Sequence, residues 1–142
     1  MQARAKWVNG FRFVGNTGNG HGVIMDGSGS DDPLGRIGPS PMELLLLGMA
    51  GCTGIDVIHI LEKSREPVTD CVVEIDGTRA DTEPKIFTHI HAVFTITGKG
   101  LDPRKVDRAV QLSAEKYCSA SLMLGKTAEI TREVHIVEEG QA

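Results

Sequence analysis

The longest apolar run of the chain covers residues 42–61, where only Glu43, Thr53, Asp56 and His59 are polar. Every other position in this run is an apolar residue or glycine. A helix that lies on a protein surface keeps one polar face, so this pattern predicts a central helix that is buried on all sides.

Both ends of this helix have sequence signals. Ser40 is a candidate N-cap, Pro41 suits the first helical position, and Glu43 stands three residues after Ser40, as in a capping box. At the other end, residues 62–65 are polar and Pro67 cannot continue a helix. We therefore expect the helix to begin near Ser40 and to end before Pro67.

Three glycines, Gly48, Gly51 and Gly54, interrupt this helix. Each costs about 1 kcal/mol of helix propensity relative to alanine, so they predict that another element packs close to the backbone. One sheet covers one side of a helix, and a chain of 142 residues has little else to cover the rest. We therefore expect an obligate homodimer in which the central helices of two chains meet.

The segments around the central helix alternate between apolar and polar residues in the manner of strands. The Asn9-Gly10 dipeptide is a strong hairpin signal. A second helical region follows later in the chain, with Asp102 as a candidate cap. The predicted strands are residues 3–7, 11–14, 21–25, 70–78, 87–97 and 128–137, and the second helical region is residues 103–124. This order predicts a single α+β domain over residues 1–142, with about six strands in an antiparallel sheet or sheets.

Composition narrows the choice of partners. The net charge is −4 and no block of Lys or Arg occurs, so nothing indicates nucleic acid or an anionic membrane as a partner. The N-terminal residues contain no apolar targeting segment, and the charged Glu43 and Asp56 argue against a membrane-spanning role for the central run. We expect a soluble cytoplasmic protein.

The chain has three cysteines, an odd number without metal-ligand spacing, which excludes a disulfide scaffold and gives no zinc motif. Thiol chemistry is one interpretation: a thiolate attacks a peroxide, and the resulting sulfenic acid condenses with a second thiol to a disulfide. The candidates are Cys52 as the attacking thiol, Cys118 as the resolving thiol and Arg36 as the group that favours the thiolate. The other interpretation is that these cysteines are buried as small apolar side chains, as we expect for Cys71. Spacing alone leaves both interpretations open.

Asp56 stands in so apolar a setting that it must be paired or solvated. We expect its partner to be His59, Arg36 or a group of a second subunit. An alternative for Arg36 is a solvated side chain beside Asp31 and Asp32.

Two segments of the chain resemble a known family. The segment SPMELLLLGMAGCTGIDV, residues 40–57, resembles the signature of the OsmC/Ohr family (osmotically inducible and organic hydroperoxide resistance proteins), whose central helix carries the reactive cysteine. The segment EKYCSASLML, residues 115–124, resembles the second cysteine segment of that family. The opening MQARAKWV and the phrase LSAEKYCS are most similar to the YhfA-like branch.

The resemblance implies an intertwined α+β homodimer with active sites at the subunit interface. It implies a peroxidase that reduces small organic hydroperoxides with electrons from a dithiol such as dihydrolipoamide. Cys52 matches the peroxidatic cysteine and Cys118 the resolving cysteine. The resemblance implies no metal and no organic cofactor.

The chain departs from the family pattern at one position. Counting back from the cysteine, the acidic residue that pairs with the catalytic arginine falls on Met42, and Glu43 is the next residue. A shift of one residue rotates a helical side chain by about 100°. Glu43, with Arg36, is therefore a candidate catalytic residue or only a helix cap. The alternative function is an OsmC-fold thiol protein without peroxidase activity that binds a small apolar or lipoyl-like ligand.

Overall fold

The computed structural model describes residues 1–140, and its contacts divide the chain into two compact units. The first unit is Met1–Leu45 and the second begins at Leu46. The long helix α1 (Pro41–Lys63) begins in the first unit and continues into the second. The architecture combines two three-stranded sheets with helices, which confirms the predicted α+β class.

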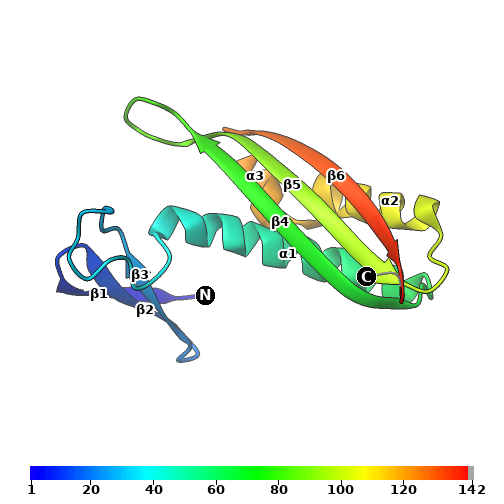
Figure 1. Ribbon diagram of the computed structural model, residues 1–142, viewed down its shortest axis with the longest axis horizontal. Coiled ribbons are helices and arrows are strands. Elements are labelled where there is room, and N and C mark those ends of the chain that lie inside the picture. Colours follow the sequence, from blue (N-terminus) through cyan, green and yellow to red (C-terminus); the bar gives the residue numbers. More distant parts are fainter. Residues whose placement is uncertain (141–142) are drawn as a thin grey trace. The chain divides into compact units, whose positions relative to one another are not determined.

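The first unit holds an antiparallel sheet of β1 (Ala3–Asn9), β2 (Arg12–Thr17) and β3 (Gly22–Asp26) (Figure 1). Gly10 in the turn between β1 and β2 has a φ of 47°, in the left-handed region that glycine adopts without strain. This geometry confirms the hairpin that the Asn9-Gly10 dipeptide predicts.

A buried arginine fastens the loop after β3 to this sheet. Nε of Arg12 lies 3.0 Å from Oδ2 of Asp26, and its Nη2 lies 2.8 Å from Oδ1 of Asp32. Asp26 also accepts a hydrogen bond of 3.0 Å from the backbone N–H of Ile37. The expectation that the Arg36 side chain lies beside Asp32 is therefore wrong. Asp32 forms an ion pair with Arg12, and Arg36 forms one with Glu43.

The start of α1 has the predicted capping box. The backbone N–H of Glu43 donates to Oγ of Ser40 at 3.2 Å, and the N–H of Ser40 donates to Oε2 of Glu43 at 2.7 Å. These two bonds satisfy donors that the first turn of a helix leaves without intrahelical partners.

The second unit holds a sheet of β4 (Val68–Arg79), β5 (Phe87–Gly98) and β6 (Glu129–Glu138), with β5 in the centre (Figure 1). β4 and β5 are antiparallel, but β6 runs parallel to β5. The prediction of purely antiparallel pairing is corrected here. The chain returns from the end of β5 to its start through a helical crossover, and only such a long connection allows parallel pairing.

The crossover consists of three helical segments: α2 (Pro103–Leu112), the π-helical turn η1 (Ser113–Tyr117) and α3 (Ser119–Leu124). Asp102 caps α2, and its carboxylate accepts a hydrogen bond of 2.9 Å from the N–H of Arg104. The predicted second helical region is therefore present, but η1 and Cys118 divide it.

The core of this unit lies between one face of the sheet and the helices. Val57 and Leu61 of α1 and Val106 of α2 are fully buried in one cluster with alternate residues of β5. Those β5 residues are Ala92, Phe94 and Ile96. Each such large apolar side chain contributes about 1.5–3 kcal/mol when buried, so this cluster fixes α1 and α2 against the same sheet face.

Within one chain, α1 is buried on one face and not on all sides as the sequence predicts. The buried residues are spaced by four: Met49, Thr53, Val57 and Leu61. On other faces of the helix, Leu47 is 59% exposed and Ile55 is 72% exposed.

Two of the helix glycines also face open space. Among the described residues, a Cβ added at Gly48 or at Gly51 would meet no atom within 4 Å. Among residues 1–140, the predicted close packing is therefore not found at Gly48 or Gly51, whereas a Cβ added at Gly54 would lie 3.5 Å from a methyl carbon of Val73.

Candidate dithiol site

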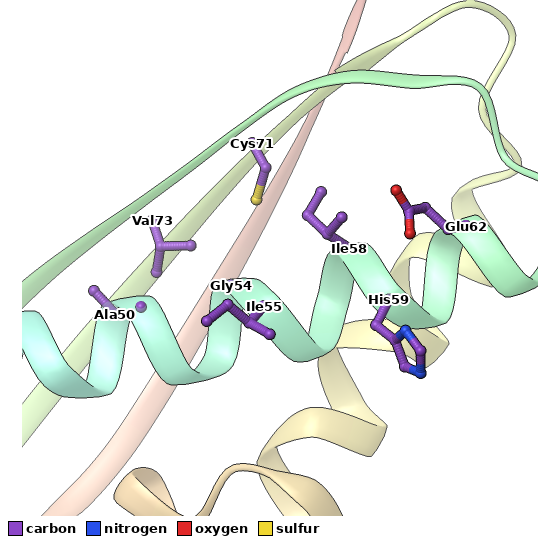
Figure 2. A pocket seen from close by; sticks show the side chains of 9 residues that line it. Ala50, Gly54, Ile55, Ile58, His59, Glu62, Cys71 and Val73 are labelled. Atoms are coloured by element: carbon purple, nitrogen blue, oxygen red, sulfur yellow. The ribbon is translucent and has the colours of Figure 1, made fainter. Parts of the chain in front are cut away.

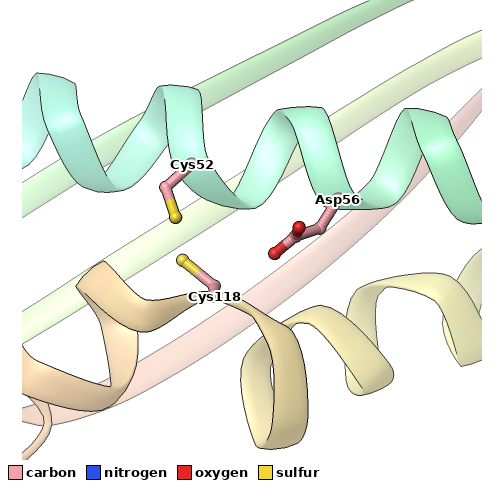
Figure 3. A group of neighbouring side chains, drawn as sticks. All are labelled: Cys52, Asp56 and Cys118. Atoms are coloured by element: carbon pink, nitrogen blue, oxygen red, sulfur yellow. The ribbon is translucent and has the colours of Figure 1, made fainter.

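The two cysteines predicted as a redox pair meet between α1 and the turn that precedes α3. Sγ of Cys52, Sγ of Cys118 and a carboxylate oxygen of Asp56 all lie within 4.8 Å of one another (Figure 3). Cys52 is half-buried and Cys118 is fully buried, and neither forms a disulfide in this structure. Two thiols and one carboxylate are thus gathered at one point, with one sulfur more accessible than the other.

Helix geometry explains the placement of the α1 residues. Cys52 and Asp56 are four residues apart, so they lie one above the other on the same helix face. Figure 3 shows both side chains pointing from α1 toward Cys118.

A π-helical turn places Cys118. The N–H of Cys118 donates to the carbonyl of Ser113 at 2.8 Å, which closes η1. Cys118 then leaves helical geometry and becomes the N-cap of α3, where its sulfur accepts a hydrogen bond of 3.4 Å from the N–H of Ser121. Short π-helical turns are rare and are frequent at functional sites.

Two buried hydroxyl groups join the cysteine-bearing segments. Oγ1 of Thr53 lies 2.8 Å from Oγ of Ser113, and Oγ of Ser113 lies 3.2 Å from Oδ2 of Asp56. Ser113 has one hydroxyl proton, so donating it to Asp56 leaves its oxygen free to accept from Thr53. This short network holds α1 against η1 directly beside the two sulfurs.

Ser113 is therefore the partner of Asp56 in the second unit, in place of the His59 that the sequence suggests. His59 is exposed. Sequence reasoning missed the role of Ser113, because its position five residues before Cys118 matches no regular helix repeat. The only signal for Thr53 was its polarity beside Cys52 in an apolar run.

The environment of Cys118 favours its neutral thiol. Burial raises the pKa of the Cys118 thiol, the hydrogen bond from Ser121 lowers it, and the neighbouring Cys52 thiol raises it further. Cys118 is therefore a thiol at neutral pH.

A cavity of about 430 Å³ has Asp56 in its wall. Asp56, His59 and Lys63 of α1 line it together with Tyr117 of η1. Asp56 therefore belongs both to the wall of this cavity and to the cluster of the two sulfurs.

The third cysteine lies elsewhere. Cys71 of β4 lines a groove of about 600 Å³ between α1 and β4, together with Val73 and the apolar Ile55 and Ile58 (Figure 2). It is half-buried, and burial raises the pKa of its thiol. Cys71 does not belong to the cluster of Cys52, Asp56 and Cys118.

Arg36 and Glu43 form an ion pair with each other in the first unit, and both side chains are partly exposed. Hydrogen bonds from Ser40, and then from Arg36, hold the pKa of Glu43 below its ordinary value. Glu43 is therefore a helix cap that also binds Arg36, and a catalytic role for either residue stays a prediction.

Comparison with known proteins gives one family and a group of similar folds. A family model described as OsmC-like protein matches residues 29–133. The protein YhfA of Escherichia coli strain K12 is 47% identical over 137 residues, which cover 96% of this chain and 98% of that relative.

Two similar solved structures carry names that refer to hydroperoxides. An organic hydroperoxide resistance protein OsmC of Legionella pneumophila has a TM-score of 0.68 at 18% identity, and covers 94% of this chain and 95% of its own. The organic hydroperoxide resistance protein OhrB of Bacillus subtilis has a TM-score of 0.65 at 17% identity, with 94% and 98% covered. At these identities the likeness shows a shared fold.

Proposed function

This chain belongs to the OsmC-like protein family, and we propose that it is a thiol-dependent peroxidase that reduces organic hydroperoxides. The observation that carries the proposal is the distance of at most 4.8 Å between the sulfurs of Cys52 and Cys118. The names of the Legionella and Bacillus proteins, which have the same fold, support the choice of organic hydroperoxides as substrates.

The proposed reaction has two steps on the protein. The Cys52 thiolate attacks the terminal peroxide oxygen, the O–O bond breaks, and the alkoxide leaves as an alcohol after taking up one proton. Cys52 is then a sulfenic acid. The Cys118 sulfur displaces its hydroxyl as water, which forms the Cys52–Cys118 disulfide. A dithiol such as dihydrolipoamide reduces this disulfide by exchange and becomes a disulfide itself.

The different environments of the sulfurs support this division of roles. Cys52 is half-buried, whereas Cys118 is fully buried. Burial raises the pKa of the Cys118 thiol and shields it from outside molecules, which suits a thiol that reacts second. The Thr53–Ser113 bond keeps the two segments close, which favours the intramolecular step over reaction with outside thiols.

We keep two further expectations as part of the proposal. Arg36, paired with Glu43, favours the thiolate and positions the peroxide. Two chains associate through the open face of α1, where Leu47 and Ile55 are exposed and Gly48 and Gly51 would admit a close neighbour. An exposed apolar surface of this kind is typical of an interaction site. We expect the dimer to act in the cytoplasm.

The test is the consumption of cumene hydroperoxide by the purified full chain with dihydrolipoamide as reductant. We expect catalytic turnover by the wild type and by the control Cys71→Ser, which removes a thiol outside the cluster. Cys52→Ser should consume peroxide no faster than buffer. If the wild type consumes peroxide no faster than Cys52→Ser, the peroxidase proposal is refuted.

One observation favours a second candidate, a thiol protein that binds a small apolar or lipoyl-like ligand without reducing peroxides. The groove beside Cys71 and Val73 has about 600 Å³ and a largely apolar lining. Titration of the thiols with a small disulfide separates the two functions. A Cys52 that reacts slowly at neutral pH, with a ligand held in the groove, would favour this second candidate.

A further inference from the structure

The dithiol site is a cluster of three groups that are all anions when deprotonated. The two thiols and the carboxylate of Asp56 lie within 4.8 Å of one another. Within the described residues from 46 to 140, Asp56 accepts a hydrogen bond from Ser113 but forms no ion pair. Deprotonating both thiols beside this carboxylate would concentrate negative charge, which a cation placed among the three groups would neutralise.

From this arrangement we infer that the reduced protein binds one zinc-like divalent metal ion through Cys52, Cys118 and Asp56. This site goes beyond the proposed function, because it needs only the reduced thiols and no peroxide. The cysteine spacing along the chain gives no zinc motif, since the ligands come from α1 and from the end of η1.

The distances fit tetrahedral coordination after a small closure. Zinc binds thiolate sulfur at about 2.3 Å and carboxylate oxygen at about 2.0–2.2 Å, so tetrahedral ligands lie roughly 3.5–3.8 Å apart. The three ligand atoms here are separated by at most 4.8 Å. Side-chain rotation of these residues would bring them onto one ion, with the fourth position open to water or to an external thiol.

The groups around the ligands are those that support metal sites. The N–H of Ser121 donates to the Cys118 sulfur at 3.4 Å, and the hydroxyl of Ser113 donates to Oδ2 of Asp56 at 3.2 Å. Hydrogen bonds to ligand atoms from such outer groups orient the ligands and stabilise their charged forms. One oxygen of Asp56 is thus oriented by Ser113, and the carboxylate keeps further lone pairs for the ion.

Metal binding and disulfide formation use the same sulfur electron pairs. Binding of the divalent ion by the two thiols and the carboxylate releases two protons. A hydroperoxide takes two electrons and two protons from the two thiols and becomes an alcohol and water, while the sulfurs join in a disulfide. Neither sulfur is then a thiolate ligand. The site therefore binds metal in the reduced state and releases it on oxidation.

The experiment is a titration of the full reduced chain with Co²⁺, a spectroscopic stand-in for Zn²⁺. We expect one Co²⁺ per chain, a thiolate-to-cobalt charge-transfer band and the strong d–d bands of tetrahedral cobalt, all removed by added Zn²⁺. The control Cys71→Ser should give the same bands. Cys118→Ser should lose most of the charge-transfer intensity, and protein first oxidised with diamide should show none.

Asp56→Asn keeps the shape of the side chain and can still accept from Ser113, so it should fold. Loss of an outer group costs about 10–100-fold in metal affinity, so loss of this ligand should weaken Co²⁺ binding by at least about tenfold. The absence of bands in the wild type, or bands that depend on Cys71 and not on Asp56, would overturn the inference. Peroxide turnover without cobalt bands would refute only the metal site, and bands without turnover would refute only the peroxidase.

Discussion

Removing the hydroxyl of Ser113 should loosen the contact that holds the two cysteine-bearing segments together. Ser113 is fully buried, and its Oγ lies 2.8 Å from Oγ1 of Thr53 and 3.2 Å from Oδ2 of Asp56. The Ser113→Ala change therefore leaves the hydroxyl of Thr53, which is 2% exposed, without its partner.

The expected magnitude follows from these contacts. A buried polar group left without its partner costs about 1–3 kcal/mol. Asp56 is only half-buried and lines a cavity, so water can replace the bond that it loses. We expect Ser113→Ala to lower the free energy of unfolding by about 2 kcal/mol, less than the total of about 5–15 kcal/mol that holds most domains folded. Thr53→Val should cost about 1 kcal/mol, because Ser113 keeps its bond to Asp56.

The assay is a double-mutant cycle measured by urea denaturation at one fixed chain concentration. The double variant should cost about as much as Ser113→Ala alone, because both polar partners are then absent. The single changes should therefore show a coupling energy of about 1 kcal/mol. Ser113→Ala should also slow disulfide formation after a pulse of hydroperoxide. Single changes that add in the double variant, or a Ser113→Ala cost below about 0.5 kcal/mol, would refute the reasoning.

Four further predictions concern the thiols, the helix cap, the pH dependence of stability and the association of chains. Cys118→Ser should leave Cys52 as a sulfenic acid that is trapped by a dimedone-type probe and over-oxidised by excess peroxide; mass spectrometry without any adduct would contradict the assigned roles. Ser40→Ala should cost about 1 kcal/mol of stability through loss of the cap, and an unchanged urea midpoint would contradict this. The pKa of Glu43 is lowered on folding from 4.5, so its stabilisation is complete above about pH 4.5 and is lost as the pH falls through the folded-state pKa. The difference in free energy of unfolding between wild type and Glu43→Gln should therefore become smaller at acid pH. A difference that becomes larger there would contradict this prediction. Ile55→Glu should make the protein monomeric in sedimentation velocity at concentrations where the wild type and Ile55→Val are dimers; identical sedimentation of all three would count against the α1 interface.

The sequence predicted the local structure well, because the relevant signals are short-range. The capping box of Ser40 and Glu43, the cap at Asp102 and the turn at Gly10 all involve residues within a few positions of one another. Alternation of apolar residues likewise predicted the strands, and the predicted strand at residues 87–97 corresponds to β5.

The sequence did not predict features that depend on how distant segments meet. The parallel pairing of β6 with β5 depends on the crossover between them, and local alternation carries no information about strand direction. The contact of Thr53 with Ser113 joins residues 60 positions apart, and a π-helical turn sets the position of Ser113. The pairing of Cys52 with Cys118 was predicted mainly from the resemblance of the two cysteine segments to the family, because no spacing rule along the chain indicates it.

The central claim is that Cys52 and Cys118 join each other when the protein reduces a peroxide. The most direct measurement is peptide mapping by mass spectrometry, without reductant, after one equivalent of cumene hydroperoxide is added to the reduced chain. The account predicts a linked pair of peptides carrying Cys52 and Cys118, with the Cys71 thiol still free. A Cys52 that is oxidised to sulfinic acid while Cys118 stays free, or a disulfide that includes Cys71, would contradict it.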